Sequence, residues 1–335
     1  MTAPAAILGA DGGNSKVDLL LASADGQVLG FRHGGTISHQ QVGLEAGIER
    51  LVELAEDLAR DAGVRGARPF AEVGAFCLAG ADFPKEIRML ARAIEGTGLA
   101  TQTVIRNDAY APLRAGTTRG WGAVLICGQG NNGLAVGPDG RTARFDAVGD
   151  YSGDWGSGPS LGKAGLAAAI RATDGRGPRT ALTASVPAYF GRRRPATVVR
   201  DIYYGRLDAE RLAELAPLVF ETASGGDPVA RAIVDRLADE LITMAAALIR
   251  RTGLTRRAPE VVLSGGVFRN RDKAFYQRLD DGIQRVPPGA RLVSPASPPV
   301  VGAALLALDA LALPPARAAA AEARLRSEAA TLGEA

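Results

Sequence analysis

The sequence predicts a duplicated α/β fold, and three observations support this prediction. Two stretches of the chain each begin with three short apolar strands and continue with alternating helices and strands. Three glycine-rich polar loops follow or join such strands. The chain has 335 residues, 47% of them hydrophobic and 22% charged, which is enough to bury one or two globular cores. Two similar blocks of this kind indicate a repeated α/β unit.

The first block opens with three antiparallel strands, because short apolar runs are separated by glycine turns such as Asp25-Gly26. A long helix follows, in which apolar residues recur at a spacing of three and four until Gly63 ends it. The elements expected in this block are strands over 5–10, 17–23 and 27–31, a helix over 43–62, a strand over 73–78, a helix over 85–95 and a strand over 101–106.

The second block repeats the pattern after a seam near 115–120. Its expected elements are strands over 121–127, 133–136 and 141–146, helices over 162–173, 179–190, 195–204, 209–221 and 228–252, a strand over 261–263, a helix over 273–284, a strand over 291–293 and a helix over 301–311. We therefore predict an N-terminal domain over 1–117 and a C-terminal domain over 118–314. The tail over 315–335 is expected to form a helix that packs back on the N-terminal domain.

The charge pattern and the cysteines exclude several classes of protein. The net charge is +3, and basic and acidic residues interleave, so no nucleic-acid partner is expected. No apolar run approaches the ~20 residues that span a bilayer, and the first residues lack the pattern of a signal peptide. Cys77 and Cys127 stand within apolar runs, which predicts neither a zinc site nor a disulfide. We expect a cytoplasmic protein without a membrane partner that acts as a homodimer.

The three glycine-rich loops, over 11–16, 128–133 and 264–267, predict a bound nucleotide. Glycine allows the backbone to approach an anion closely, and successive backbone N–H groups form concave anion sites. Two other interpretations fail. Residues 128–133 match the glycine pattern of dinucleotide sites, but a short strand follows where that pattern needs a helix. Residues 156–163 have the wrong spacing for a P-loop.

Three carboxylates are candidates for function. Asp11 ends the first strand and can face Mg²⁺ or its waters, although Asp before Gly-Gly also stabilises turns. Asp108 follows a buried strand and is the candidate base or orienter for an attacking hydroxyl, although Asp is also a common helix N-cap. Asp154 lies in a glycine-dense loop, where ligand binding and turn formation both remain open. His39, beside Ser38 in a polar stretch, is a candidate only through its context.

Taken together, these motifs resemble the N-acetylglucosamine kinase branch of the BadF/BadG/BcrA/BcrD-type ATPases, within the sugar kinase, Hsp70 and actin superfamily. The resemblance runs from Leu8 to Leu308. Three segments resemble the phosphate and catalytic motifs: 11–16 the first phosphate motif, 107–109 the catalytic Asp-Ala segment and 125–132 the second phosphate loop. Three more resemble other parts of the family pattern: 221–228 a helix boundary with Gly-Asp-Pro near the nucleotide, 261–267 the adenosine motif and 299–304 the hinge segment.

The resemblance implies two ribonuclease-H-like domains, as in actin-like ATPases, with ATP and a sugar in the cleft between them. Asp108 would activate the 6-hydroxyl of N-acetylglucosamine or a related amino sugar for attack on the γ-phosphate, and Asp11 would face Mg²⁺. The residues expected around ATP are Asp11, Gly12, Gly13, Asn14, Ser15, Lys16, Gly128, Gly130, Asn131, Gly265, Gly266 and Val267. The residues expected around the sugar are Ser38, His39, Asp108, Gln129, Asn132 and Asp154.

Two departures from the family pattern concern the sugar. Ser38 stands where an Asn normally contacts the sugar, and Trp155 stands where a Glu is usual. The phosphate motifs match better, so the sequence predicts a sugar kinase and leaves its sugar open. Two alternatives also remain open. One is an ATPase that activates a dehydratase through a shared [4Fe–4S] cluster, which needs exposed cysteines. The other is a non-catalytic sugar or nucleotide sensor on the same fold.

Overall fold

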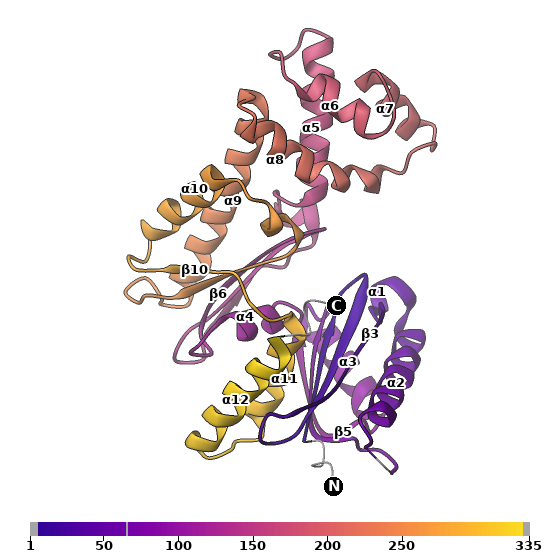
Figure 1. Ribbon diagram of the computed structural model, residues 1–335, viewed down its shortest axis with the longest axis vertical. Coiled ribbons are helices and arrows are strands. Elements are labelled where there is room, and N and C mark those ends of the chain that lie inside the picture. Colours follow the sequence, from indigo (N-terminus) through magenta and orange to yellow (C-terminus); the bar gives the residue numbers. More distant parts are fainter. Residues whose placement is uncertain (1–5, 65, 331–335) are drawn as a thin grey trace. The chain divides into compact units, whose positions relative to one another are not determined.

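The computed structural model describes residues 6–64 and 66–330, which form two compact units. Unit 1 combines the chain up to Trp121 with the chain from Ser294 onward, and unit 2 spans Gly122–Val293. Each unit contains one five-stranded sheet with helices packed on it (Figure 1). In the described part of the chain, no helix combines the length and the apolar character that crossing a membrane requires.

The sheet of unit 1 has the strand order β3-β2-β1-β4-β5. The hairpin partners β1, β2 and β3 are antiparallel, whereas β1, β4 and β5 run parallel. Its strands are β1 (Ile7–Gly12), β2 (Lys16–Ala22), β3 (Val28–Gly35), β4 (Ala71–Leu78) and β5 (Ala100–Asn107). Its helices are α1 (His39–Val42), α2 (Leu44–Asp61), α3 (Pro84–Glu95), α4 (Tyr110–Gly116), α11 (Pro299–Ala310) and α12 (Pro315–Ala329).

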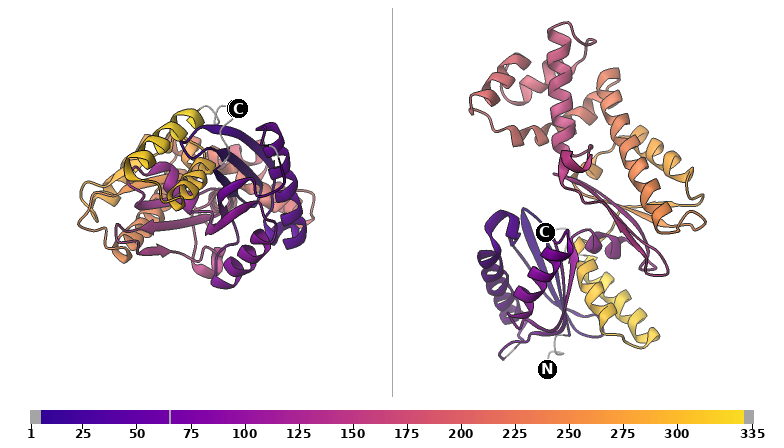
Figure 2. Two further views of the ribbon diagram at one scale, coloured as in Figure 1. Left: turned by 90° about the horizontal axis from the view of Figure 1, so that it is seen from below. Right: turned by 180° about the vertical axis from the view of Figure 1, so that it is seen from behind.

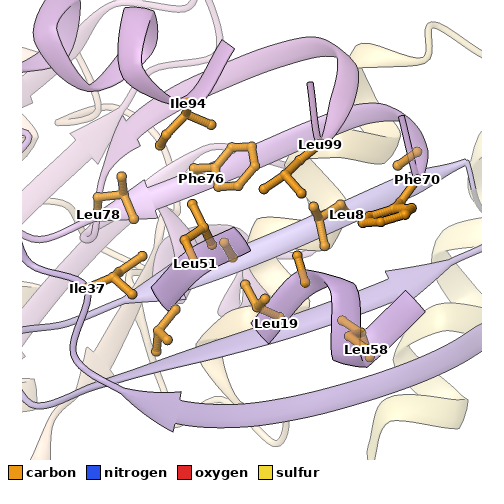
Figure 3. Close-up of a cluster of buried hydrophobic side chains, with 14 of the residues drawn as sticks. Leu8, Leu19, Ile37, Leu51, Leu58, Phe70, Phe76, Leu78, Ile94 and Leu99 are labelled. Carbon is orange, nitrogen blue, oxygen red and sulfur yellow. The ribbon is translucent and has the colours of Figure 1, made fainter. Parts of the chain in front are cut away.

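Both faces of this sheet are covered by helices. On one face α2 and α3 bury a core that includes Leu19, Leu51 and Phe76 (Figure 3). On the other face α11 and α12 bury a second core with residues such as Ile7 and Leu305 (Figure 1). Because parallel strands are buried on both faces, β1 and β4 are almost continuously apolar until they reach their carboxyl ends. The polar residue of β1, Asp11, therefore stands near the carboxyl end of its strand.

The position of α11 corrects the predicted domain limits. The predicted C-terminal domain extends to residue 314, but α11 and α12 belong to unit 1. The physical reason is close packing at glycines. A Cβ on Gly9 of β1 would lie 2.5 Å from the Ala304 N atom, and a Cβ on Gly302 would lie 1.8 Å from the Ala111 O atom of α4. The units therefore divide at 121/122 and 293/294, in place of 117/118 and 314/315.

The sheet of unit 2 has the order β10-β9-β6-β7-β8. Its strands are β6 (Gly122–Cys127), β7 (Asn131–Val136), β8 (Thr142–Arg144), β9 (Glu260–Ser264) and β10 (Arg291–Val293). Its helices are η1 (Gly149–Ser152), α5 (Gly158–Thr173), α6 (Leu182–Tyr189), α7 (Pro195–Tyr203), η2 (Ala209–Leu215), α8 (Ala216–Ser224), α9 (Pro228–Arg251), η3 (Gly266–Arg269) and α10 (Lys273–Gln284). Within this unit, α9 packs on the sheet and α5 to α8 extend away from it (Figure 2).

The two sheets have the same topology, which confirms the predicted duplicated α/β fold. β6 pairs antiparallel with β7 and parallel with β9, as β1 does with β2 and β4. The limits of several elements differ from the predictions, and α4 was not among the expected elements. Two further differences concern helices. The polar stretch at Ser38 leads into the short helix α1, and the helix expected over 209–221 is divided into η2 and α8. Pro217 explains the division, because proline is favoured in the first turn of a new helix and not inside one.

Candidate active site

The first glycine-rich loop is the tight turn between β1 and β2. The Gly13 N–H donates to the Lys16 carbonyl at 2.9 Å, and the Thr36 hydroxyl donates to the Gly13 carbonyl at 2.8 Å. The Ala79 N–H donates to the Gly12 carbonyl at 2.7 Å. These bonds anchor the turn to the segments that follow β3 and β4, while Asn14 and Ser15 are exposed at its tip.

Asp108 follows β5 directly and lies at the same edge of the sheet as this turn. Its N–H donates to the carbonyl of Leu78, the last residue of β4, at 3.2 Å. Before it, the Asn107 Nδ2 atom donates to Asp82 Oδ1 at 3.0 Å, and Asn107 Oδ1 accepts from the Ala109 N–H at 3.1 Å. The backbone is therefore fixed on both sides of the Asp108 carboxylate.

Asp11 and Asp108 repel each other electrostatically. Burial raises the pKa of Asp11 to about 8, and the negative charges of Asp108 and Asp18 add to the rise, while Lys16 opposes it. A carboxyl group with this pKa holds its proton at neutral pH unless a cation approaches. At the carboxyl ends of β1 and β5, a bound cation would therefore favour the ionised form of Asp11 beside Asp108.

Ser38 and His39 provide unsatisfied polar atoms beside this edge. The Ser38 N–H donates to the Thr36 hydroxyl at 3.0 Å, the same hydroxyl that binds Gly13. In the described part of the chain, Ser38 Oγ and His39 Nδ1 are buried and have no hydrogen-bond partner. A Cβ on Gly80 would lie 2.6 Å from His39 Cε1, so the imidazole packs against the loop after β4. Since buried polar atoms are normally paired, these two atoms point to a polar ligand.

Asp18 on β2 forms a second charged cluster next to Asp11. Its side chain is 3% exposed and accepts from the Lys16 ammonium at 2.8 Å and from His33 Nδ1 at 2.6 Å. The sheet register places Asp18 directly opposite Asp11. Lys16, which ends the first glycine-rich loop, is therefore held by a carboxylate within its own hairpin.

The other two glycine-rich loops meet within unit 2. Residues 128–133 contain the hairpin turn between β6 and β7, in which the Gly128 N–H donates to the Gly130 carbonyl at 2.9 Å. A Cβ on Gly128 would lie 3.7 Å from the Gly266 N atom. Gly265 has a φ of +102° and passes so close to the hairpin that a Cβ would lie 2.3 Å from the Cys127 O atom. Glycine is therefore required at 265 for both reasons.

Asn131 links this hairpin to the start of α5. Its Nδ2 atom donates to the Trp155 carbonyl at 2.9 Å, while its Oδ1 atom is buried and, among the described residues, has no partner. The N–H of Gly158, the first residue of α5, donates to the Gly128 carbonyl at 2.8 Å. The N-terminus of this 16-residue helix carries positive partial charge and thus favours an anion near the hairpin.

Each glycine-rich loop contains at least one glycine that neither packing nor backbone conformation requires. Gly13, Gly130 and Gly266 all lie outside the set of described glycines with positive φ. A Cβ on Gly130 or Gly266 would meet no atom within 4 Å, and a Cβ on Gly13 would meet only the Lys16 O atom, at 3.7 Å. Space is therefore left at all three loops where a ligand's phosphate could approach the backbone.

The predicted sugar residues are divided between the two units. Ser38, His39 and Asp108 lie in unit 1, whereas Gln129, Asn132 and Asp154 lie in unit 2. Asp154 Oδ2 accepts from the Gly149 N–H at 3.1 Å and from the Ser152 hydroxyl, and Asn132 Oδ1 accepts from the Gly133 N–H at 2.8 Å. Gln129 is exposed. For Asp154 and Asn132, turn formation is therefore at least part of their role.

Four residues of this edge were not predicted from the sequence: Thr36, Asp82, Asp18 and His33. For Asp18 a signal existed, since it is a charged residue inside the apolar strand 16–22. Asp82 and Thr36 act through single hydrogen bonds to loops distant in the sequence, and no local pattern marks them. Trp155 packs under the Arg236 guanidinium, whose carbon lies 3.9 Å from the ring centre.

Magnesium would bind here only together with phosphate. Among the described residues, no group of three or more His, Cys, Asp or Glu side chains could hold a metal ion. Mg²⁺ commonly takes one or two carboxylates and fills its other positions with water and phosphate oxygens. Asp11 fits that requirement, because its carboxyl group lies at the phosphate turn and is destabilised in its charged form until a cation approaches.

The sequence is similar to a known protein family and to two kinases. Residues 8–307 match the BadF/BadG/BcrA/BcrD ATPase family. The chain is 27% identical over 317 residues to the N-acetyl-D-glucosamine kinase of Dictyostelium discoideum, covering 90% of this chain and 97% of that protein. It is 24% identical over 305 residues to the N-acetylmuramic acid/N-acetylglucosamine kinase of Clostridium acetobutylicum, with the same coverage of both chains.

Solved structures give the same result for the fold. A Chromobacterium violaceum protein proposed to be an N-acetylglucosamine kinase has a TM-score of 0.69 and 27% identity, covering 90% of this chain and 98% of its own. The ROK hexokinase of Thermus thermophilus has a TM-score of 0.60 at 20% identity, with 91% and 99% coverage, and supports the fold alone.

Proposed function

Because the chain belongs to the BadF/BadG/BcrA/BcrD ATPase family, we propose that it is an ATP-dependent sugar kinase that phosphorylates N-acetylglucosamine or a related amino sugar. The single observation that carries the proposal is the edge of the unit 1 sheet. There, the phosphate turn, the Asp108 carboxylate and the unpaired atoms of Ser38 and His39 lie at the ends of neighbouring strands. The names of the curated relatives support the same activity.

The proposed reaction is phosphoryl transfer to the 6-hydroxyl of the sugar. Asp108 accepts the proton of that hydroxyl as its oxygen bonds to the γ-phosphorus, the bond from the γ-phosphorus to the β,γ-bridging oxygen breaks, and ADP leaves. The fixed backbone around Asp108 keeps the carboxylate oriented. Ser38 Oγ and His39 Nδ1 bind the sugar and orient it. When bound, Mg²⁺ neutralises phosphate charge. The residues that would hold it are Asp11 and, through the phosphates, the turn over 11–16.

In unit 2 we propose that the paired loops bind ATP. Their contact at Gly128 and Gly266, the unpaired Asn131 Oδ1 atom and the α5 N-terminus support a site for phosphate and adenosine. Gly130, Gly266 and Val267 would line it. Closure of the two domains, which would exclude water from the reaction, stays a prediction.

The residues disfavour one alternative function, and a single assay tests the other. The dehydratase activator needs accessible thiolates for its cluster, but Cys77 and Cys127 are buried, and burial raises the pKa of both thiols. The sensor would bind a sugar and ATP without transferring phosphate. A direct assay of the phosphorylated sugar therefore separates kinase from sensor.

The decisive experiment replaces Asp108 by Asn and measures ADP release and sugar phosphate with N-acetylglucosamine, neutral hexoses and other amino sugars. Because general base catalysis contributes about 100-fold or more, Asp108→Asn should lose at least that factor in kcat while ADP binding is retained. Asp57→Asn, which removes the same charge from a half-exposed, ion-paired position on α2, is the matched control. Activity of Asp108→Asn above about a tenth of wild type would contradict the assigned role.

A further inference from the structure

Asp18 is a buried carboxylate whose two oxygens each bind a nitrogen donor. Lys16 Nζ lies 2.8 Å from Oδ2, and His33 Nδ1 lies 2.6 Å from Oδ1. The Asp18 side chain is 3% exposed, whereas those of Lys16 and His33 are 56% and 58% exposed. A buried carboxylate remains charged only where such donors compensate for its lost hydration. The cluster therefore holds a negative charge inside the sheet and faces solvent only through its donors.

The sheet register places this cluster in one row with the residues of the site. His33 pairs with Asp18, Asp18 with Asp11, Asp11 with Cys77, and Cys77 with Arg106. Directly paired residues of neighbouring strands project from the same face. Asp18 and Asp11 are thus neighbours on one face, and their negative charges repel each other.

Lys16 has two carboxylates within electrostatic reach. It attracts the charged form of Asp11 and thereby opposes the rise in the Asp11 pKa, but its hydrogen bond is to Asp18. A lysine side chain is flexible, and fixing its ammonium requires a partner. If Lys16 paired with Asp11, it would neutralise the carboxylate that we assign to Mg²⁺. The contact with Asp18 leaves Asp11 available and places the ammonium at the end of the phosphate turn.

We propose that Asp18 is a positioning residue: together with His33, it holds the Lys16 ammonium at the phosphate turn and away from Asp11. The role of Lys16 is then to stabilise negative charge on the phosphate during transfer, so the inference rests on the proposed kinase function. Asp18 touches neither ligand in this arrangement. Its whole effect on catalysis passes through Lys16.

A double-mutant cycle tests this assignment. Lys16→Met should lower kcat by about 100-fold, as loss of one preorganised charge donor does, and leave the KM for the sugar unchanged. Asp18→Asn should lower kcat at least about tenfold with the same unchanged KM. In the Lys16→Met background, Asp18→Asn should change kcat by less than threefold, because residues that act as one unit are not additive. Independent, multiplying effects of the two changes overturn the proposal.

Two further variants keep the test decisive. If Asp18→Asn does not fold, His33→Ala removes an exposed partner of the same carboxylate, and it should lower kcat about threefold in wild type and not in the Lys16→Met background. Asp57→Asn again controls for the loss of a carboxylate from unit 1 and should keep wild-type kinetics. Equal effects of His33→Ala in both backgrounds also overturn the proposal.

Nucleotide affinity separates this inference from the proposed function. If the wild-type chain phosphorylates no sugar, the kinase assignment fails, and the cycle is repeated on ATP binding in EDTA by calorimetry. Lys16→Met and Asp18→Asn should then weaken ATP binding by similar factors, and the double variant should bind no more weakly than Lys16→Met. Wild-type affinity in Asp18→Asn would overturn the positioning role even then.

Discussion

At the scale of single residues, Asp11 combines two properties that conflict in the ligand-free protein. It lies at the phosphate turn, where a negatively charged carboxylate could bind a cation. Burial, together with the negative charges of Asp108 and Asp18, raises its pKa to about 8. A carboxyl group whose pKa rises on folding from 3.8 to about 8 binds more protons in the folded state between these values. Its ionisation therefore reduces stability as the pH increases across that window.

We predict that Asp11→Asn stabilises the ligand-free protein at pH 8. The amide cannot ionise, so the melting temperature should exceed that of wild type by at least about 2 °C, the shift that roughly 1 kcal/mol produces in a domain of 150–250 residues. The gain should shrink as the pH falls toward 4, because ionisation of the folded-state carboxyl group of wild type is then suppressed and the unfolded chain also begins to take up the proton. Thermal melts from pH 4 to pH 8 measure it. A gain that does not depend on pH would show that ionisation is not its cause.

The sequence predicted the residues of this edge that stand at strand ends or in glycine turns. Asp11 and Asp108 follow apolar strands, which is a local pattern, and both lie at the predicted edge. Asp18 and His33 could not be assigned, because their role depends on the register of three strands. Thr36 acts through a hydroxyl shared by two loops, and this contact exists only once β1, β2 and β3 are paired.

At the scale of elements, α4, α11 and α12 are joined by buried charges. The Arg114 guanidinium is 8% exposed and donates to Asp309 of α11 at 2.9 and 3.0 Å and to Glu322 of α12 at 2.9 and 2.7 Å. Arg326 of α12 donates to the carbonyls of Arg114, Ala115 and Thr117 at the end of α4. The consecutive helices α11 and α12 thus share one network with α4, which lies almost two hundred residues earlier in the chain.

Glu322 should therefore stabilise unit 1 in a pH-dependent manner. Burial by itself raises the pKa of Glu322, but hydrogen bonds from Arg114 and Arg326 offset this effect and hold the pKa below its usual value. Because the folded-state pKa is lowered, the stabilisation is present above the unfolded pKa of 4.5 and is lost as the pH falls below it. Replacing Glu322 removes the central carboxylate of the network.

We predict that Glu322→Gln lowers the free energy of unfolding of unit 1 by about 1–3 kcal/mol at pH 7, less than for a fully buried pair since Glu322 is 25% exposed. At pH 3 the difference from wild type should be much smaller. Urea unfolding at the two pH values tests this, and Glu95→Gln at the exposed end of α3 is the control. An equal loss at both pH values would mean that packing, and not charge, explains the effect.

The limits of an element were predicted well where its apolar pattern repeats over several turns. The sheet that a helix covers was not predicted, because tertiary packing determines it. α2 and α9 lie within two residues of their predicted limits, because their apolar faces repeat over several turns. α11 was predicted as a core helix, but it is apolar on every side except at Asp309, and such a pattern does not identify the sheet that it covers. Its partner is β1, almost three hundred residues earlier, and the contact at Gly9 is visible only in the fold.

At the scale of the whole molecule, unit 2 is one continuous segment and unit 1 is not. Unit 2 runs from Gly122 to Val293 and contains its own sheet, its own buried strands and both loops of the proposed ATP site. Unit 1 needs α11 and α12 to cover β1, β2 and β4. The two units should therefore respond differently when they are separated.

We predict that residues 122–293, expressed alone, fold cooperatively and bind ADP, because a continuous domain carries its own core. Residues 1–121 alone should remain largely unfolded, since the face of β1 at Gly9 lacks its helix. Joining 294–335 to residue 121 through a glycine-serine linker should restore folding. Circular dichroism and hydrogen exchange distinguish these outcomes. Cooperative folding of 1–121 without α11 would contradict this account of the core.

The discontinuity of unit 1 also sets an order of events on the ribosome. At about 5–20 residues per second, roughly 10 to 30 s pass between synthesis of residue 121 and synthesis of residue 294. During that interval all five strands of the first sheet have been made, but the helix that fits against Gly9 has not. Unit 2 is complete before unit 1 can close its core, so the middle segment of the chain matures before the segment that precedes it. Nascent chains stalled before α11 should therefore expose apolar sheet surface and be the form that recruits chaperones.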